Sequence, residues 1–90
     1  MNTNGLEALT ILSEVNRRPG LLKGRLAAAA MDTLGRGESE TRVFLGFIDD
    51  LLGIGYLTKH RFSYHLTPAG EVALASVQAS TTPAFYKSFA

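Results

Sequence analysis

The spacing of apolar side chains along the chain predicts four helices and one pair of strands. The first helix is expected over about Leu6 to Arg18, because apolar residues gather on one side of a 3.6-residue turn while Glu7 and Glu14 fall on the polar side. Asn4 is its expected N-cap, since Glu7 follows three residues later as in a capping box. A Pro-Gly pair then ends this helix.

Two more helices follow before the strands. The second is expected over about Leu21 to Leu34, where consecutive alanines favour helix and allow close packing. The third, from about Ser39 to Gly53, has the clearest separation of apolar and polar positions in the chain. Ser39 is its expected N-cap and Gly55 its expected stop. We expect a core made of Val43, Phe47, Ile48, Leu51, Leu57, Tyr64 and Leu66.

The second half of the chain changes to strand patterning. Residues 57–60 and 62–66 are rich in strand formers and roughly alternate, which predicts an antiparallel hairpin. Thr67 and Pro68 form a strong helix start, with the threonine as N-cap and the proline at the first helical position. A fourth helix is therefore expected to end near Gln78.

This order of elements resembles that of winged helix-turn-helix domains, and two segments carry the resemblance. Residues 48–57, IDDLLGIGYL, resemble the end of a recognition helix running into the first wing strand. Residues 64–70, YHLTPAG, resemble the return strand and next helix of bacterial PadR- and MarR-type transcriptional regulators. The resemblance covers about residues 6–78. It implies a mainly α fold with a small β-hairpin: a three-helix core, a two-stranded wing and a C-terminal helix.

The resemblance implies that the chain binds duplex DNA and regulates transcription. In such domains the third helix enters the major groove and the wing contacts the backbone. Here the first half of that helix offers a guanidinium for guanine, two hydroxyls and a glycine where a duplex presses. The densest basic run lies at the hairpin tip, suited to phosphates. The expected DNA-binding residues are Ser39, Thr41, Arg42, Gly46, Lys59, His60 and Arg61, with Lys23, Arg25 and Arg36 on the same side of the fold.

Charge keeps a second interpretation open. Nine Lys and Arg against eight Asp and Glu give a formal net charge of +1, so DNA contact requires local clustering of basic residues. Asp49 and Asp50 on the polar side of the third helix repel phosphate. The alternative is a winged-helix protein–protein interaction module without DNA binding, in which Arg42 pairs with a neighbouring carboxylate and Gly46 accommodates a partner helix.

The sequence contains no motif typical of an enzyme active site. It lacks cysteine, its two histidines fall on opposite faces of the predicted hairpin, and no nucleophile elbow or phosphate-binding glycine loop is present. We therefore expect no enzyme, no metal and no cofactor. The longest apolar stretch, residues 26–31, is far shorter than the ~20 residues of a membrane span. With no basic start ahead of an apolar segment, a cytoplasmic protein without membrane contact is expected.

Length and the end of the chain bear on assembly. Ninety residues, 46% of them hydrophobic, suit one domain over residues 1–90, with a core over about 6–78 and a tail over 79–90. The tail carries Phe85, Tyr86 and Phe89, which is unusually aromatic. We therefore expect a homodimer through the fourth helix and the tail, giving the two-fold symmetry that palindromic DNA sites require.

Overall fold

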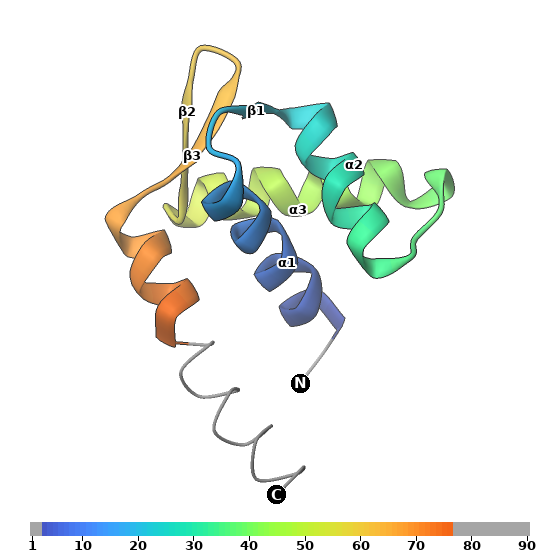
Figure 1. Cartoon of the computed structure of the whole chain (residues 1–90), viewed down its shortest axis with the longest axis horizontal. Coiled ribbons are helices and arrows are strands. Elements are labelled where there is room, and N and C mark those ends of the chain that lie inside the picture. The colour runs from blue at the N-terminus through green and yellow to red at the C-terminus, as the bar shows by residue number, and fades with distance from the viewer. Residues whose placement is uncertain (1–2, 77–90) are drawn as a thin grey trace, which may run out of the picture.

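The computed structural model, which describes residues 3–76, shows a helical body with a small antiparallel sheet at one side (Figure 1). The elements are α1 (Thr3–Arg17), β1 (Leu21–Leu22), α2 (Lys23–Leu34), the 3-10 turn η1 (Glu38–Glu40), α3 (Thr41–Ile54), β2 (Leu57–His60) and β3 (Ser63–Leu66). Residues 68–76 are helical again. The prediction of a mainly helical fold with a small hairpin is confirmed. The expected end of the fourth helix and the aromatic tail lie outside the described residues.

The sheet has three strands rather than the two that were predicted. The hairpin pairs Leu57 with Leu66 and His60 with Ser63, so its turn contains two residues. The third strand, β1, pairs antiparallel with β3 and gives the order β1-β3-β2. Two residues are too few to show alternation, and this apolar pair also suits a helix start, so the pattern placed it in the second helix. Gly20, with φ of 95°, leads into β1 and donates its N–H to the Tyr64 carbonyl at 2.9 Å.

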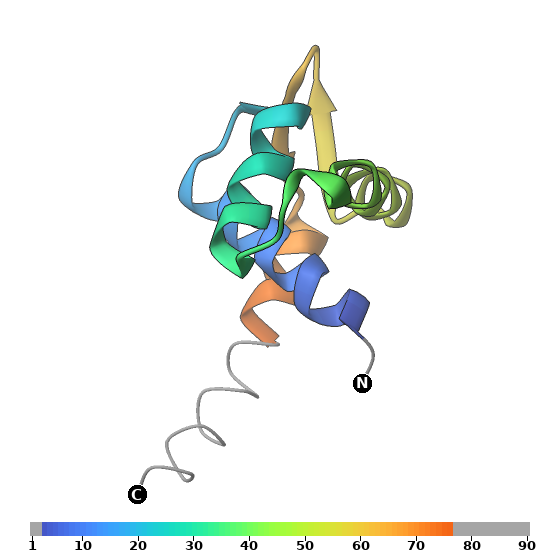
Figure 2. The same ribbon diagram turned by 90° about the vertical axis from the view of Figure 1, so that its right-hand side faces the viewer.

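The helix α3 crosses the molecule and separates its two ends. In Figure 1 the hairpin projects to one side of α3, while the helix of residues 68–76 runs to the other. Figure 2, which shows α3 almost end-on, gives the same arrangement. The helices α1 and α2 pack on each other, and both contact α3. One side of α3 is therefore covered by helices.

The core is centred on Phe44, which is fully enclosed. It lies with Ile48 and Leu51 on the covered side of α3, and its ring meets that of Phe47 edge to face, with centroids 5.5 Å apart. The other fully buried large side chains are Ile11, Val15, Leu26 and Leu57.

Four of the seven predicted core residues are buried, and one is outside the core. Ile48, Leu51, Leu57 and Tyr64 are buried, and Phe47 and Leu66 are partly buried against them. Val43 is 50% exposed, so its assignment to the core was wrong. The apolar arc of α3 is broad, and helix packing centres it one residue later than expected, on Phe44.

Helix starts differ from the predicted ones. Since α1 begins at Thr3, Asn4 lies inside the helix and is not its N-cap. Ser39 lies in η1, so it is not the N-cap of α3; Glu40 holds that position without a side-chain capping bond. The Thr41 hydroxyl instead donates to the Glu38 carbonyl at 2.7 Å and closes the preceding turn. Gly55 ends α3 as predicted, with φ of 97°.

A close joint connects the end of α3 to the C-terminal helix. The Thr67 hydroxyl donates to the Gly55 carbonyl at 2.6 Å and accepts from the Gly70 N–H at 3.0 Å, which confirms its predicted role as N-cap. The Thr67 N–H donates to the Tyr56 carbonyl at 3.1 Å. Gly70 packs so closely on that carbonyl group that a Cβ there would overlap it. The joint thus requires glycine for its lack of a side chain.

We predict that Gly70→Ala lowers the free energy of unfolding by about 1–3 kcal/mol, the usual cost of an overpacked contact. Gly53→Ala is the matched control, because a Cβ there meets nothing within 4 Å. On an open helix position it should raise stability by roughly 0.5–1 kcal/mol. Urea denaturation of both variants measures the difference. Equal stability of the two variants would show that the backbone contact at Tyr56 is not kept in solution.

Candidate nucleic-acid interface

One side of α3 is open to solvent along its whole length. Arg42, Gly46, Asp49 and Gly53 recur at the spacing of a single helical stripe, and all four are exposed. This stripe lies away from the core row that contains Phe44, so packing of the core determines which side chains remain outside. Among the described residues no carboxylate pairs with Arg42.

The Asp49 carboxylate on this stripe has a basic partner. Lys23, the first residue of α2, places its Nζ 2.6 Å from an Asp49 oxygen. Both side chains are partly exposed, and such a pair contributes little to stability. Lys23 therefore offsets the repulsion of a phosphate by Asp49, and it can exchange partners at low cost. Arg25, two residues after Lys23, is also exposed. The exposed Asp50 carboxylate has no basic partner among the described residues.

The start of α3 gathers three predicted residues. Ser39, Thr41 and Arg42 line a pocket of about 600 Å³ together with Glu38 and Val43. The Ser39 side chain is exposed, but the hydroxyl of Thr41 already donates to the preceding turn. Of these three side chains, Arg42 therefore has the hydrogen-bond donors that are most available to a ligand.

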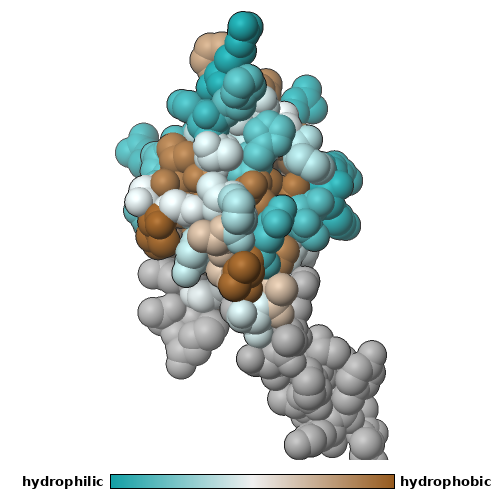
Figure 3. Space-filling model, turned by 90° about the vertical axis from the view of Figure 1, so that its left-hand side faces the viewer, coloured by the Kyte–Doolittle hydropathy of each residue, from teal (hydrophilic) through white to brown (hydrophobic). Residues whose placement is uncertain are grey.

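The hairpin turn holds a second group of basic side chains. Lys59, His60 and Arg61 are all exposed at its end. Arg61 has φ of 61°, and it is the one non-glycine with positive φ in residues 3–76. The Ser63 hydroxyl donates to the His60 carbonyl at 3.0 Å and closes the turn. In the space-filling view of Figure 3 the hairpin is largely hydrophilic, and apolar side chains form separate spots over the body below it.

Arg36 lies in a cluster of its own. Its guanidinium bridges Glu40 at 2.8 Å and Glu7 at 2.9 Å, and lies 5.9 Å from the centre of the Phe44 ring. The hydrogen bond to Glu40, followed by that to Glu7, raises the pKa of Arg36 above its ordinary value. This residue joins α1, η1 and α3, so its donors are engaged within the fold and not offered to a ligand.

Two acidic side chains expected on the polar side of α1 are buried. Glu7 and Glu14 are 3% and 4% exposed. Glu14 accepts two hydrogen bonds from Arg17 and one from Thr33, whereas one oxygen of Glu7 has no partner among the described residues. From their polarity alone, both side chains were expected on the solvent-exposed side of α1. Partners 19 and 29 residues away, Thr33 and Arg36, bring them inside.

Comparison with known proteins adds no relative to this picture. A scan against family models finds no match, and searches of curated proteins and of solved structures find none either. Within the described residues no three His, Asp or Glu side chains gather closely enough to hold a metal ion. Over the same part of the chain, no helix has both the length and the apolar character needed to cross a membrane.

We predict that Arg36→Ala lowers the thermal unfolding midpoint, because it leaves the buried Glu7 carboxylate without its basic partner. Arg25→Ala removes the same charge from an exposed side chain and should leave the midpoint unchanged. Adding Glu7→Gln to Arg36→Ala should recover part of the loss, since the uncompensated charge is then gone. Circular dichroism melts of the three variants test this. Equal midpoints for Arg36→Ala and Arg25→Ala would contradict a structural role for the cluster.

Proposed function

We propose that the chain is a winged helix-turn-helix domain that binds duplex DNA, with α3 in the major groove and the hairpin on the backbone, as a transcriptional regulator. The order of helices and the three-stranded sheet are compatible with this fold. The resemblance of residues 48–57 and 64–70 to PadR- and MarR-type regulators supports it from the sequence.

The proposal rests on the location of the Lys and Arg side chains that form no ion pair. In residues 3–76, the Lys and Arg side chains outside any ion pair are Arg18, Arg25, Arg42, Lys59 and Arg61. All but Arg18 belong to the first turns of α2 and α3 or to the hairpin. A cation without a carboxylate partner is free to bind a phosphate and release its counterions, which gives salt-dependent affinity.

The same distribution of paired and unpaired charges explains how a chain with a net charge of +1 can present a basic surface. Glu7, Glu14 and Glu40 are matched by arginines within the helical body. Asp49, the carboxylate on the open stripe of α3, is matched by Lys23. The paired carboxylates thus cancel basic charge mainly where it supports the fold, while Arg42 and the cations of the hairpin stay outside any ion pair.

We predict that Lys59→Ala and Arg61→Gly each weaken binding to all DNA sequences and reduce the slope of log affinity against log salt by about 1. Glycine is chosen at residue 61 because it accepts the positive φ without strain, so the fold is kept. Arg42→Ala should instead reduce discrimination between sites, by roughly 1–3 kcal/mol at the base it contacts. Fluorescence anisotropy with mixed-sequence duplex at several salt concentrations measures all three.

Arg18→Ala is the matched control, since it removes an exposed charge just after the end of α1, outside the proposed surface. It should leave both affinity and salt slope unchanged. A wild-type chain without salt-dependent DNA affinity at low ionic strength would favour the second candidate, a protein-interaction module. That candidate is supported by two apolar side chains at the ends of α3, Val43 and Ile54, which are 50% and 63% exposed.

A homodimer is part of the proposal, because a palindromic site requires two copies of α3 about 34 Å apart. The described part of the C-terminal helix offers an apolar surface for the second copy. Pro68, Ala69, Val72 and Ala73 line a pocket of about 700 Å³ beside Tyr56, and Val72 is 67% exposed. The aromatic residues at 85, 86 and 89 continue this apolar character along the sequence.

We predict that Val72→Asp converts the dimer to a monomer in sedimentation velocity, since it places a charge in the shared surface without disturbing a buried site. Deletion of residues 83–90 should act in the same direction. Val43→Asp places the same charge at the start of α3, outside this surface, and should leave the sedimentation coefficient unchanged. A wild-type chain that already sediments as a monomer would remove the dimer from the proposal.

A further inference from the structure

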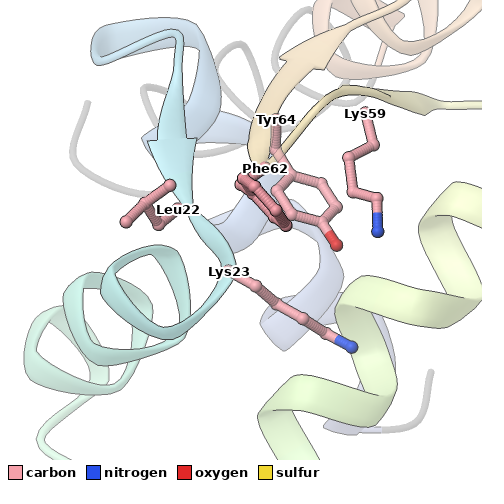
Figure 4. Close-up of a pocket in the computed structure, with 5 residues that line it drawn as sticks. All are labelled: Leu22, Lys23, Lys59, Phe62 and Tyr64. Atoms are coloured by element: carbon pink, nitrogen blue, oxygen red, sulfur yellow. The ribbon is translucent and has the colours of Figure 1, made fainter.

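A pocket of about 360 Å³ lies between the hairpin and the segment where β1 leads into α2 (Figure 4). Its lining residues are Leu22, Lys23, Lys59, Phe62 and Tyr64. Figure 4 shows the rings of Phe62 and Tyr64 on the hairpin side, with the side chains of Lys23 and Lys59 extending toward α3. The pocket therefore combines aromatic and aliphatic walls with two ammonium groups.

The ring of Phe62 is exposed and is not part of the hydrophobic core. It is 76% exposed, the highest value among the large apolar side chains of residues 5–76. Tyr64, two residues later on β3, is buried, and it lines the same pocket as Phe62. Apolar character thus continues from the buried Tyr64 into the hairpin turn, where Phe62 is presented to solvent beside basic groups. An exposed aromatic ring in this setting is typical of a binding surface.

The charges around the pocket favour an anion. Lys59 lies directly opposite Tyr64 in the hairpin register and has no carboxylate partner among the described residues. Lys23 is matched by Asp49 through an exposed pair that exchanges easily. A flat aromatic group with an attached phosphate complements both the rings and the ammonium groups. Nucleic acid offers this combination in a nucleobase, but only where the base is unpaired and its face is free.

We infer that this pocket binds an unpaired nucleobase of a DNA strand, with Phe62 stacking on the base and Lys59 contacting its phosphate. The inference rests on the proposed function and narrows its substrate: DNA with an unpaired base next to duplex is preferred over uninterrupted duplex. Stacking of a base on an aromatic side chain, combined with a positively charged track for the backbone, is the usual basis of single-strand binding. Lys23 lines the pocket and contacts α3, so it joins this site to the duplex-binding surface.

The test compares a blunt duplex of about 20 base pairs with the same duplex carrying an overhang of about four nucleotides, and with the single strand alone. We expect the overhang to raise wild-type affinity by about 5- to 100-fold, the range that one stacked base supplies. Phe62→Ala should abolish this gain and leave blunt-duplex affinity unchanged. Phe62→Tyr should keep the gain, because it retains a ring. Since Phe62 is exposed, neither variant should lose the fold, and thermal melts check this.

Controls separate the pocket from the rest of the surface. Leu6→Ala removes another exposed apolar side chain, on α1 and outside the proposed surfaces, and should change nothing, whereas Lys59→Ala should weaken binding to every probe. Free dAMP, added as competitor, distinguishes a strand from a loose nucleotide: displacement of the overhang probe by micromolar dAMP would overturn the assignment to a strand.

The two proposals fail in different ways. Equal wild-type affinity for blunt and overhanging duplex, or an equal loss for both in Phe62→Ala, overturns the pocket and leaves duplex binding intact. Absence of affinity for all three probes overturns the proposed function as well. Binding to the single strand alone, lost in Phe62→Ala, supports the pocket while overturning the placement of α3 in a duplex groove.

Discussion

The rotation of α3 about its own axis determines what this molecule presents to a partner. Phe44, Ile48 and Leu51 face α1 and α2, and full burial of a phenylalanine side chain is worth about 1.5–3 kcal/mol in transfer from water. Turning the helix by one residue would expose Phe44 and bury Arg42 or Asp49 without a partner. The core therefore holds α3 in one rotational orientation, and that orientation leaves the stripe from Arg42 to Gly53 exposed.

Long-range ion pairs hold the elements around this core and also shape the electrostatic surface. Arg36 connects Glu7 on α1 to Glu40 before α3, and Lys23 connects α2 to Asp49. The two contacts differ in energy, because Glu7 is buried whereas Lys23 and Asp49 are partly exposed to water. The first supports the fold and would leave a buried charge if broken. The second is weak enough that a phosphate can replace the carboxylate. The same residue types thus have different roles according to their burial.

Those parts of the structure that depend on neighbouring residues could be predicted from the sequence, and those that depend on distant ones could not. Thr67 as N-cap, Gly55 as helix stop and the hairpin at residues 57–66 follow from local patterns. The burial of Glu7 depends on Arg36, 29 residues away, and no pattern within α1 contains it. The two residues of β1 are too few to show alternation.

The prediction of α3 and of the candidate site divides in the same way. Adjacent apolar residues at 43, 44, 47 and 48 make the apolar arc broad, so periodicity predicts the helix but not the centre of its buried face. The basic hairpin end was visible as a run of charges. Phe62 beside it was expected only as a strand residue, because its exposure depends on where the core ends. The candidate site was thus predictable in its charges but not in its aromatic wall.

The hairpin turn departs from local preference at two consecutive positions. Arg61 adopts a positive φ that glycine or asparagine would occupy at lower cost, and Phe62 exposes a large ring where a polar residue would be better solvated. Strained backbone of this kind costs on the order of 1–3 kcal/mol. Neither departure is compensated by a hydrogen bond or a core contact of these side chains among the described residues. Departures from local preference without a structural return are expected where function requires the side chains. The turn presents a guanidinium and an aromatic ring at consecutive positions, in accord with the contacts proposed for Arg61 with the DNA backbone and for Phe62 with an unpaired base.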